Sequence, residues 1–291
     1  MRTKNAASML RCILAVCCMG PAFAYKHIIF MHGLFAGPWE FNTLSKWLQK
    51  EHPGTTYTVI DKFNTLSSLT NLWQQVDTIK KNVTSVMKQH PEGVHLLCYS
   101  QGGLVCRGLL QSMPNHNVEN FISLSSPLAG QYGATSYMKH LFPFFVKETL
   151  YKFLYTKEGQ EISIGNYWND PHHQNMYLNN SQFLPYINNE RPTTNSSEYK
   201  SGFTKIKNLV MVGGPDDGVI TPWQSSQFGF YNSSEEVADM RSQKWYEHDL
   251  FGLKTLDKQR RIHTYTLPNI SHTFWYRTRK VWDCCVKQWL T

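Results

Sequence analysis

The chain has 291 residues, of which 41% are hydrophobic and 17% are charged. This is enough apolar material for the core of one large domain, and it excludes an intrinsically disordered chain. The formal net charge is +8, but basic and acidic residues are interspersed without a basic stripe, which argues against nucleic acid as a partner. No uninterrupted apolar run approaches the roughly 18 residues that a transmembrane helix needs.

Residues 1–24 have the layout of a secretory signal peptide. Three basic residues precede a short apolar run and a small-x-small cleavage motif: Arg2, Lys4 and Arg11, then residues 12–19, then Ala22-Phe23-Ala24. Cleavage after Ala24 would make Tyr25 the first mature residue and would lower the net charge from +8 to +5. Entry into the secretory pathway also agrees with five Asn-x-Ser/Thr glycosylation motifs, at Asn82, Asn179, Asn195, Asn232 and Asn269.

Four of the seven cysteines remain after removal of this segment: Cys98, Cys106, Cys284 and Cys285. In an oxidising compartment the first two favour a disulfide that ties the end of a strand to the helix after it. Cys284 and Cys285 are adjacent, and because bridges between neighbouring residues are strained, their redox state stays open.

Strands and helices alternate through the first half of the mature chain. Short β-rich runs predict strands at 26–31, 55–60, 94–98 and 121–124. Between them, apolar residues recur at helical spacing over 41–48, 69–86 and 102–110. This alternation predicts a mostly parallel sheet with right-handed crossovers and helices on both faces.

The pattern breaks down over an insertion at about 131–205, which holds aromatic runs and a polar, Asn-rich stretch. An insertion of this size between sheet strands usually forms a cap. Strands resume at 208–212 and 261–267, and a final helix is predicted near 276–290. We therefore expect one domain over residues 25–291 with a cap-like insertion.

The strongest catalytic signal is the run Val94-His-Leu-Leu-Cys-Tyr-Ser-Gln-Gly-Gly103. It places Ser100 directly after a buried strand and directly before a helix, which is the context of a nucleophile elbow. The tight turn requires small residues on either side of the serine. Gly102 supplies one, and the compact Cys98 stands where glycine is usual. The alternative is a strand-to-helix loop that happens to contain a serine.

A serine hydroxyl is a weak nucleophile and needs a base that an acid orients. In the α/β-hydrolase fold the chain order is serine, acid, histidine. His272 follows the last strand and fits the base, whereas His263 lies within that strand and His248 falls too early. The acid should follow the preceding strand, where Asp216 and Asp217 fit equally well.

Backbone N–H groups must also bind the oxyanion that forms during acyl transfer. One donor would be Gln101, the residue after the nucleophile. The other would lie in the loop after the first strand, in His32-Gly-Leu-Phe35.

Two further motifs lie in the insertion. Asp170-Pro-His-His173 could suggest a metal site. Adjacent histidines point in different directions, however, and no further ligand stands at a helical spacing, so we prefer structural hydrogen bonding and expect no metal. The aromatic run Phe142–Phe145 fits either ordinary core packing or a groove for an acyl chain.

Several long strings resemble the palmitoyl-protein thioesterase family, from about His27 to the C-terminus. They are His32-Gly-Leu-Phe35, Cys98-Tyr-Ser-Gln-Gly-Gly-Leu-Val-Cys106, Ser123-Leu-Ser-Ser-Pro127, Asn166-Tyr-Trp168 with Asp170-Pro-His-His173, residues 213–226, and Ile270-Ser-His272. The resemblance implies an α/β-hydrolase with Ser100 as nucleophile, Asp217 as orienting acid and His272 as base. It also implies backbone donors at Leu34 and Gln101 and a disulfide between Cys98 and Cys106.

The chain departs from the family pattern at three cysteine positions. Relatives carry a cysteine pair in the insertion where this chain has Leu154 and Gly165. Tyr265 stands where a relative has the partner of the cysteine that matches Cys285. These differences concern the rigidity of the cap rather than the catalytic residues.

The resemblance implies a lysosomal enzyme that hydrolyses long-chain fatty acyl thioesters, such as palmitoyl-CoA, through an acyl-serine intermediate and without a cofactor. A secreted location is the alternative. Since the same catalytic parts cleave oxygen esters, a lipase or carboxylesterase is the first rival function. A catalytically silent lipid-binding member of the fold is the second, and the complete set of Ser100, Asp217 and His272 argues against it.

Overall fold

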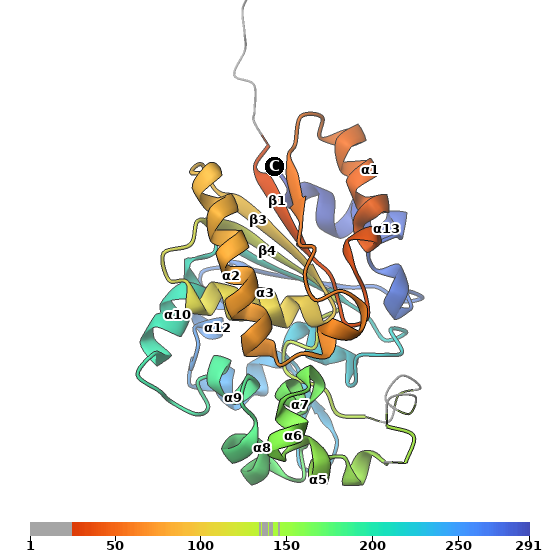
Figure 1. Cartoon of the computed structure of the whole chain (residues 1–291), viewed down its shortest axis with the longest axis vertical. Coiled ribbons are helices and arrows are strands. Elements are labelled where there is room, and N and C mark those ends of the chain that lie inside the picture. Colours follow the sequence, from red (N-terminus) through yellow and green to blue (C-terminus); the bar gives the residue numbers. More distant parts are fainter. Residues whose placement is uncertain (1–24, 134, 136–138, 140–141, 145) are drawn as a thin grey trace, which may run out of the picture.

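The computed structural model in Figure 1 describes residues 25–133, 135, 139, 142–144 and 146–291. The predicted signal peptide, residues 1–24, lies outside these described residues. Six parallel strands form one sheet in the order β2-β1-β3-β4-β5-β8. Their bounds are β1 His27–Met31, β2 Tyr57–Val59, β3 Val94–Tyr99, β4 Val118–Leu124, β5 Asn208–Gly213 and β8 Ile262–Thr266. The predicted parallel sheet is confirmed.

Helices cover both faces of the sheet, as the alternation of elements predicted (Figure 1). On one face lie α1 (Asn42–Glu51), α13 (Arg279–Val281), η7 (Trp282–Val286) and η8 (Lys287–Trp289), and on the other α2 (Leu72–Gln89), α3 (Gln101–Ser112) and α10 (Ser196–Lys205). Successive residues of β3 contribute to opposite cores, Leu96 to the α2–α3 side and Leu97 to the α1 side. Because both of their faces are buried, the central strands β1, β3, β4 and β5 are mostly apolar, whereas the edge strands β2 and β8 are partly exposed and carry more polar residues.

The predicted C-terminal helix begins later than its sequence pattern indicates. It starts at Arg279 instead of Tyr276, because the preceding segment turns toward the end of β5, where His272 and Trp275 contact Asp217. The helical segment then changes type, since η7 is a π-helix and η8 a 3-10 helix. The start of this helix is thus set by contacts far along the chain and not by local periodicity.

The segment between β4 and β5 has two parts. Its first part forms short helices beyond the carboxyl ends of the strands: α5 (Tyr151–Leu154), α6 (Lys157–Gln160), α7 (Ser163–Tyr167), α8 (Gln174–Asn180) and α9 (Leu184–Ile187) (Figure 1). Its last helix, α10, instead packs against α3 on the face of the sheet. The cap-like part of the predicted insertion therefore ends before α10.

A small hairpin and two helices after β5 have no clear signal in the sequence. They are β6 (Phe230–Tyr231), β7 (Val237–Ala238), α11 (Lys244–Glu247) and α12 (Leu253–Lys258). Each strand has only two residues, which is too short for an alternating apolar pattern to develop.

Packing and hydrogen bonds occupy the positions where relatives carry additional cysteines. Gly165 lies against α5, since a Cβ at this glycine would stand 3.1 Å from the carbonyl oxygen of the buried Leu154. The Tyr265 hydroxyl accepts hydrogen bonds from Gln288 Nε2 at 2.8 Å and Trp289 Nε1 at 3.2 Å. Cys285 is bonded to Cys284. Hydrogen bonds to Tyr265 thus hold the C-terminal segment against β8.

A buried arginine joins α3 to the cap. Arg107 is fully buried and donates hydrogen bonds from its Nη1 to Leu128 O and from its Nη2 to Ile187 O, both at 3.0 Å. Its guanidinium also lies 4.1 Å from the centre of the Phe251 ring and 5.0 Å from that of Phe228. Burial lowers the pKa of Arg107 to about 9, so the side chain stays charged near neutral pH.

Replacing Arg107 by alanine is expected to lower the free energy of unfolding by about 3–5 kcal/mol, because the carbonyls of Leu128 and Ile187 lose charged donors in the interior. Urea unfolding measures this loss. Arg241→Ala is the matched control, since Arg241 pairs with Asp257 at the surface and such a pair contributes at most about 1 kcal/mol. Equal losses for the two variants would contradict this role for Arg107.

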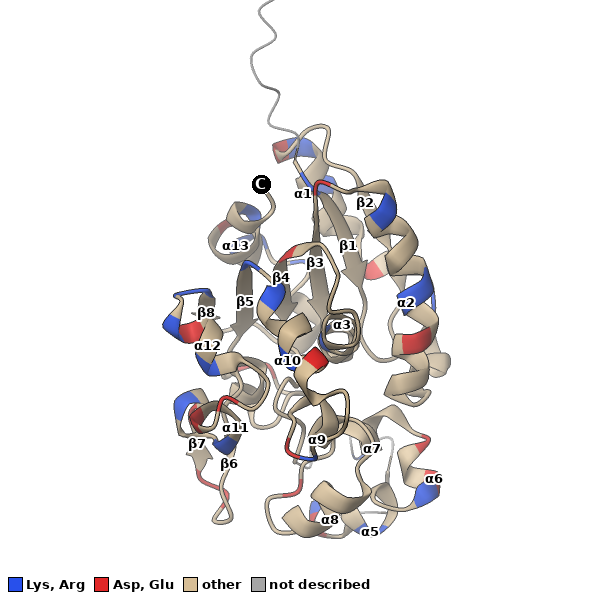
Figure 2. Cartoon of the chain, turned by 90° about the vertical axis from the view of Figure 1, so that its left-hand side faces the viewer, with Lys and Arg blue, Asp and Glu red and all other residues tan. Residues whose placement is uncertain are grey.

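Charges of both signs are interspersed over the outer helices and loops (Figure 2). No helix in the described part of the chain combines the length and the apolar character needed to cross a bilayer.

Candidate active site

Ser100 lies in the sharp turn between β3 and α3. Its φ of 53° is in the left-handed region, which is rare for residues other than glycine and costs backbone energy. The turn brings the start of α3 against the end of β1, so a Cβ on Gly102 would lie 2.6 Å from Met31 O. A Cβ on Gly33 would similarly lie 2.8 Å from Ser100 Cβ. Both positions therefore require glycine, and for Gly102 this agrees with the small residue that the predicted elbow needs there.

The structure brings three of the predicted residues into one hydrogen-bonded line. His272 Nε2 lies 2.8 Å from Ser100 Oγ, and His272 Nδ1 lies 2.8 Å from Asp217 Oδ2. Pattern alone left Asp216 and Asp217 equivalent. Asp216 is exposed and accepts a hydrogen bond from the Asn269 N–H at 2.7 Å, so only Asp217 contacts the histidine. This arrangement can remove a proton from the serine hydroxyl.

Asp217 is held as a carboxylate by four donors besides the histidine. They are Ser125 Oγ at 2.5 Å, Trp275 Nε1 at 2.6 Å, Ile220 N at 2.7 Å and Val219 N at 3.0 Å. Burial, the largest single influence, acts to raise the pKa of Asp217, but the hydrogen bonds from His272 and the other donors outweigh it and keep the pKa below its usual value.

Ser125 and Trp275 were not predicted from the sequence. Ser125 follows β4, the strand next to β5, in Ser123-Leu-Ser-Ser-Pro127, and its position at the carboxyl end of a parallel strand is a signal that could have identified it. Trp275 has no such signal, because its ring nitrogen reaches Asp217 only through the turn after His272.

Ser68 connects the two segments that carry the predicted oxyanion donors, Leu34 and Gln101. Gln101 is the first residue of α3, so its N–H has no acceptor within the helix. Leu34 lines the same cavity as Ser100. Ser68 joins their segments, since its Oγ accepts from the Phe35 N–H at 2.7 Å and its carbonyl accepts from Gln101 Nε2 at 2.8 Å. Ser68 lies in a short 3-10 helix that sequence periodicity does not reveal.

Ser100 and His272 open onto a cavity of about 260 Å³. Most of its remaining wall is apolar and comes from Leu34, Phe35, Ala36, Pro127, Val219 and Ile220. The run Phe142–Phe145 contributes no described residue to this wall: Phe142 packs on the main core, Phe144 is 96% exposed and Phe145 lies outside the described residues. An apolar wall beside the serine suits an acyl chain.

Glu40 also lies on the wall of this cavity and was not predicted. Burial raises the pKa of Glu40 to about 7, although hydrogen bonds from the Tyr276 hydroxyl and the Gly33 N–H act in the opposite direction. Its Oε2 is buried and has no partner among the described residues. The folded state therefore favours the neutral carboxylic acid.

The raised pKa of Glu40 predicts a loss of stability with rising pH. Between pH 4.5 and about 7 the folded state retains a proton that the unfolded state releases, so this contribution is complete below pH 4.5 and disappears as pH rises through 7. Relative to Glu40→Gln, the wild type should lose on the order of 2 kcal/mol of unfolding free energy between pH 5 and 8. Urea titrations at several pH values test this, with the exposed Glu148→Gln as control. Parallel curves for wild type and Glu40→Gln would contradict it.

The remaining histidines that the sequence singled out make structural contacts. Asp170 is buried and accepts hydrogen bonds from the His172 N–H at 2.9 Å and His173 Nδ1 at 3.0 Å. His263 Nε2 bonds to Asn208 Oδ1 at 3.1 Å, and His248 ends α11. Within the described residues, no group of three or more His, Cys, Asp or Glu side chains could hold a metal ion.

The predicted disulfide partners are bonded to each other. Cys98 in β3 and Cys106 in α3 form a bridge on either side of Ser100 in sequence, and it ties the strand to the helix of the elbow.

Comparison with known proteins agrees with this geometry. The model of the palmitoyl protein thioesterase family matches residues 27–272. The chain is 50% identical to the lysosomal thioesterase PPT2 of Rattus norvegicus and 49% identical to that of Homo sapiens, in each case over 92% of this chain and 89% of the relative. It is 42% identical to the Drosophila melanogaster homolog, over 94% of both proteins.

A solved structure shares the fold. Lipase B of Aspergillus fumigatus superimposes with a TM-score of 0.50 at 12% identity, over 91% of this chain and 52% of the lipase. The predicted α/β-hydrolase fold is thus confirmed, and the match over residues 27–272 decides the family within it. The chain belongs to the palmitoyl protein thioesterase family.

Proposed function

We propose that this chain is a serine hydrolase that cleaves long-chain fatty acyl thioesters such as palmitoyl-CoA. The observation that carries the proposal is the hydrogen-bonded line from Ser100 through His272 to Asp217 at an apolar cavity. Relatives that match most of the chain bear the name lysosomal thioesterase, which selects the thioester among the possible acyl substrates.

In this proposal Ser100 Oγ attacks the thioester carbonyl carbon while His272 Nε2 accepts the hydroxyl proton. Asp217 keeps Nδ1–H of His272 facing the carboxylate and stabilises the imidazolium that forms. The backbone N–H groups of Leu34 and Gln101 donate to the developing oxyanion. The carbon–sulfur bond then breaks, the departing thiolate takes the proton from His272 Nε2 and leaves as the free thiol, and acyl-Ser100 remains.

The second half of the reaction uses the same residues. His272 removes a proton from water, which attacks the acyl carbonyl carbon. His272 then gives this proton to Ser100 Oγ as the bond between Oγ and the acyl carbon breaks, and the fatty acid departs. The five donors to Asp217 make this half efficient, because a carboxylate that stays ionised keeps the imidazole oriented through both steps.

A substrate panel tests the choice of thioester. Because a thiol ionises near pH 8.5 and an alcohol far above that, a thiolate leaves without full protonation. We expect kcat/KM for a palmitoyl thioester to exceed that for an oxygen ester with a matched leaving portion by more than about tenfold, or 1.4 kcal/mol of barrier. Equal or faster cleavage of the oxygen ester would favour the lipase or carboxylesterase function instead.

We further propose that the chain reaches the lysosome through the secretory pathway, after removal of residues 1–24. The relatives' names support the lysosome. All five predicted glycosylation sites, Asn82, Asn179, Asn195, Asn232 and Asn269, have exposed side chains, as attached carbohydrate requires.

A further inference from the structure

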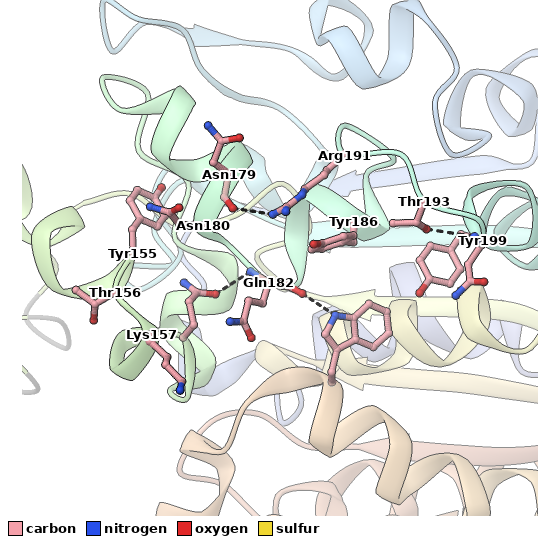
Figure 3. A pocket seen from close by; sticks show the side chains of 13 residues that line it. Tyr155, Thr156, Lys157, Asn179, Asn180, Gln182, Tyr186, Arg191, Thr193 and Tyr199 are labelled. Carbon is pink, nitrogen blue, oxygen red and sulfur yellow. Dashed lines mark hydrogen bonds between the residues drawn. The ribbon is translucent and has the colours of Figure 1, made fainter.

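A second cavity of the molecule does not adjoin Ser100. It is an open groove of about 680 Å³, within the range of about 300–1,000 Å³ typical of ligand sites. Its walls come from the start of α2, the α5–α6 turn, the α8–α9 segment and the residues before and within α10 (Figure 3). It shares no lining residue with the cavity at Ser100.

The chemistry of this groove is that of a carbohydrate site. Four aromatic residues line it, namely Trp73, Tyr155, Tyr186 and Tyr199, together with amide and hydroxyl side chains and two basic ones, Lys157 and Arg191. None of the described lining residues is acidic. A pyranose ring has C–H faces that pack on aromatic rings and hydroxyl edges that need amide and hydroxyl partners, so this mixture suits it. An acyl chain, by contrast, would leave these amides without partners.

The groove also has a covalent source of carbohydrate on its wall. Asn195 lines it, precedes α10 and begins the glycosylation motif Asn195-Ser196-Ser197. Asn195 lies one helical turn before Tyr199, whose backbone N–H donates to Asn195 O at 2.9 Å, and the Tyr199 ring lies 6.0 Å from that of Trp73. The first sugar would therefore begin beside this aromatic pair.

We propose that the N-linked glycan on Asn195 lies in this groove and packs its first sugars on Tyr199 and Trp73. The proposal rests on glycosylation of Asn195 and is independent of the reaction at Ser100. A glycan in this position bridges α10 to α2 and to the cap, because Trp73 Nε1 donates to Gln182 O at 2.7 Å between α8 and α9 (Figure 3). It would thereby hold the cap against the helices of the sheet.

Asn179 lies on the same groove and is the rival point of attachment. Its carbonyl oxygen accepts from Arg191 Nη1 at 2.7 Å (Figure 3). The contact between Asn195 and Tyr199 favours Asn195, since it starts the glycan at the aromatic pair.

The test compares the glycosylated full-length protein with two variants that remove single motifs without touching the groove lining. Ser197→Ala removes the motif at Asn195, and Ser234→Ala removes the motif at Asn232, in the exposed turn between β6 and β7. Site-resolved mass spectrometry first measures occupancy. Peptide-N-glycosidase then removes the glycans from the native protein, and the cleavage rate is measured at each asparagine. Dividing this rate by the rate at the same asparagine in the unfolded protein gives the normalised cleavage rate.

We expect the normalised cleavage rate at Asn195 to be at least about tenfold slower than at Asn232, since a packed glycan is released only when the groove opens. Hydrogen exchange of residues 71–75 and 196–203 should be faster in Ser197→Ala than in wild type and unchanged in Ser234→Ala. An unoccupied Asn195, or equal rates with no change in exchange, would overturn the proposal. Faster exchange in Asn179→Gln but not in Ser197→Ala would overturn it too, in favour of the glycan on Asn179.

Discussion

Replacing Ser100 by alanine is expected to lower kcat for palmitoyl-CoA hydrolysis on the order of 10⁶-fold, the size of loss seen when a serine hydrolase loses its nucleophile. The reason is that, among the residues that the structure describes, no other hydroxyl bonds to His272 Nε2, so no acyl-enzyme can form. Stability should change little, because alanine removes a single oxygen from a residue whose backbone is set by Gly33 and Gly102.

Labelling with a fluorophosphonate probe measures the same step directly. Wild type should be labelled at Ser100 and Ser100→Ala not at all. Ser112→Ala is the matched control, because Ser112 lies at the end of the same helix and its hydroxyl donates to Leu109 O in that helix. Labelling of Ser100→Ala at the wild-type rate would refute the assignment and would show that another residue is the nucleophile.

Replacing Asp217 by asparagine should lower kcat about 10⁴-fold with little change in fold. An amide at this position presents an N–H group to one of the donors from His272, Ser125 and Trp275. The imidazole then loses the acceptor that holds its proton on Nδ1, and Nε2 no longer accepts from the serine.

Asp216→Asn is the control for this second prediction, since the two carboxylates are neighbours and only one contacts His272. Asp216→Asn should keep close to wild-type activity, because Asp216 bonds only to the Asn269 N–H at the surface. Steady-state rates with palmitoyl-CoA distinguish the two. A large loss in Asp216→Asn with little in Asp217→Asn would reverse the assignment.

Ser100 could be predicted because it follows a strand with a recognisable apolar run, and His272 because it follows the last β-rich run of the chain. The order of strands along the chain then brings the carboxyl ends of β3, β5 and β8 to one edge of the sheet. Asp216 and Asp217 could not be separated in this way, because they are adjacent in one loop. The N–H groups of Val219 and Ile220 point at Asp217, and this loop geometry decides the matter.

Residues that support the site escaped prediction because contacts between distant segments define them. Trp275 reaches Asp217 across 58 positions of the sequence, and Ser68 reaches Gln101 across 33. Glu40 is inconspicuous in its own 3-10 helix, and its pKa is raised by burial in the folded protein, which the local sequence does not reveal. The fold of the sheet follows from local periodicity, whereas the surroundings of the site depend on packing.

The cap was foreseeable as a segment but not as a structure. Its helices α5, α6, α7 and α9 have four or five residues each, too few for a periodic apolar face. The positions of these helices are set instead by hydrogen bonds from side chains such as Asn166, whose Oδ1 accepts from the Leu72 N–H and whose Nδ2 donates to Gln160 O. Such amide bridges replace the regular patterns that helix prediction requires.

Trapping the acyl-enzyme tests the central claim most directly. Purified protein is mixed with palmitoyl-CoA, quenched in acid within milliseconds and digested for mass spectrometry. Our account predicts a palmitoyl group on the peptide that contains Ser100, formed in a burst together with free CoA and absent in Ser100→Ala. Release of CoA with the acyl group on another residue, or with no acylated peptide at any time, would contradict it.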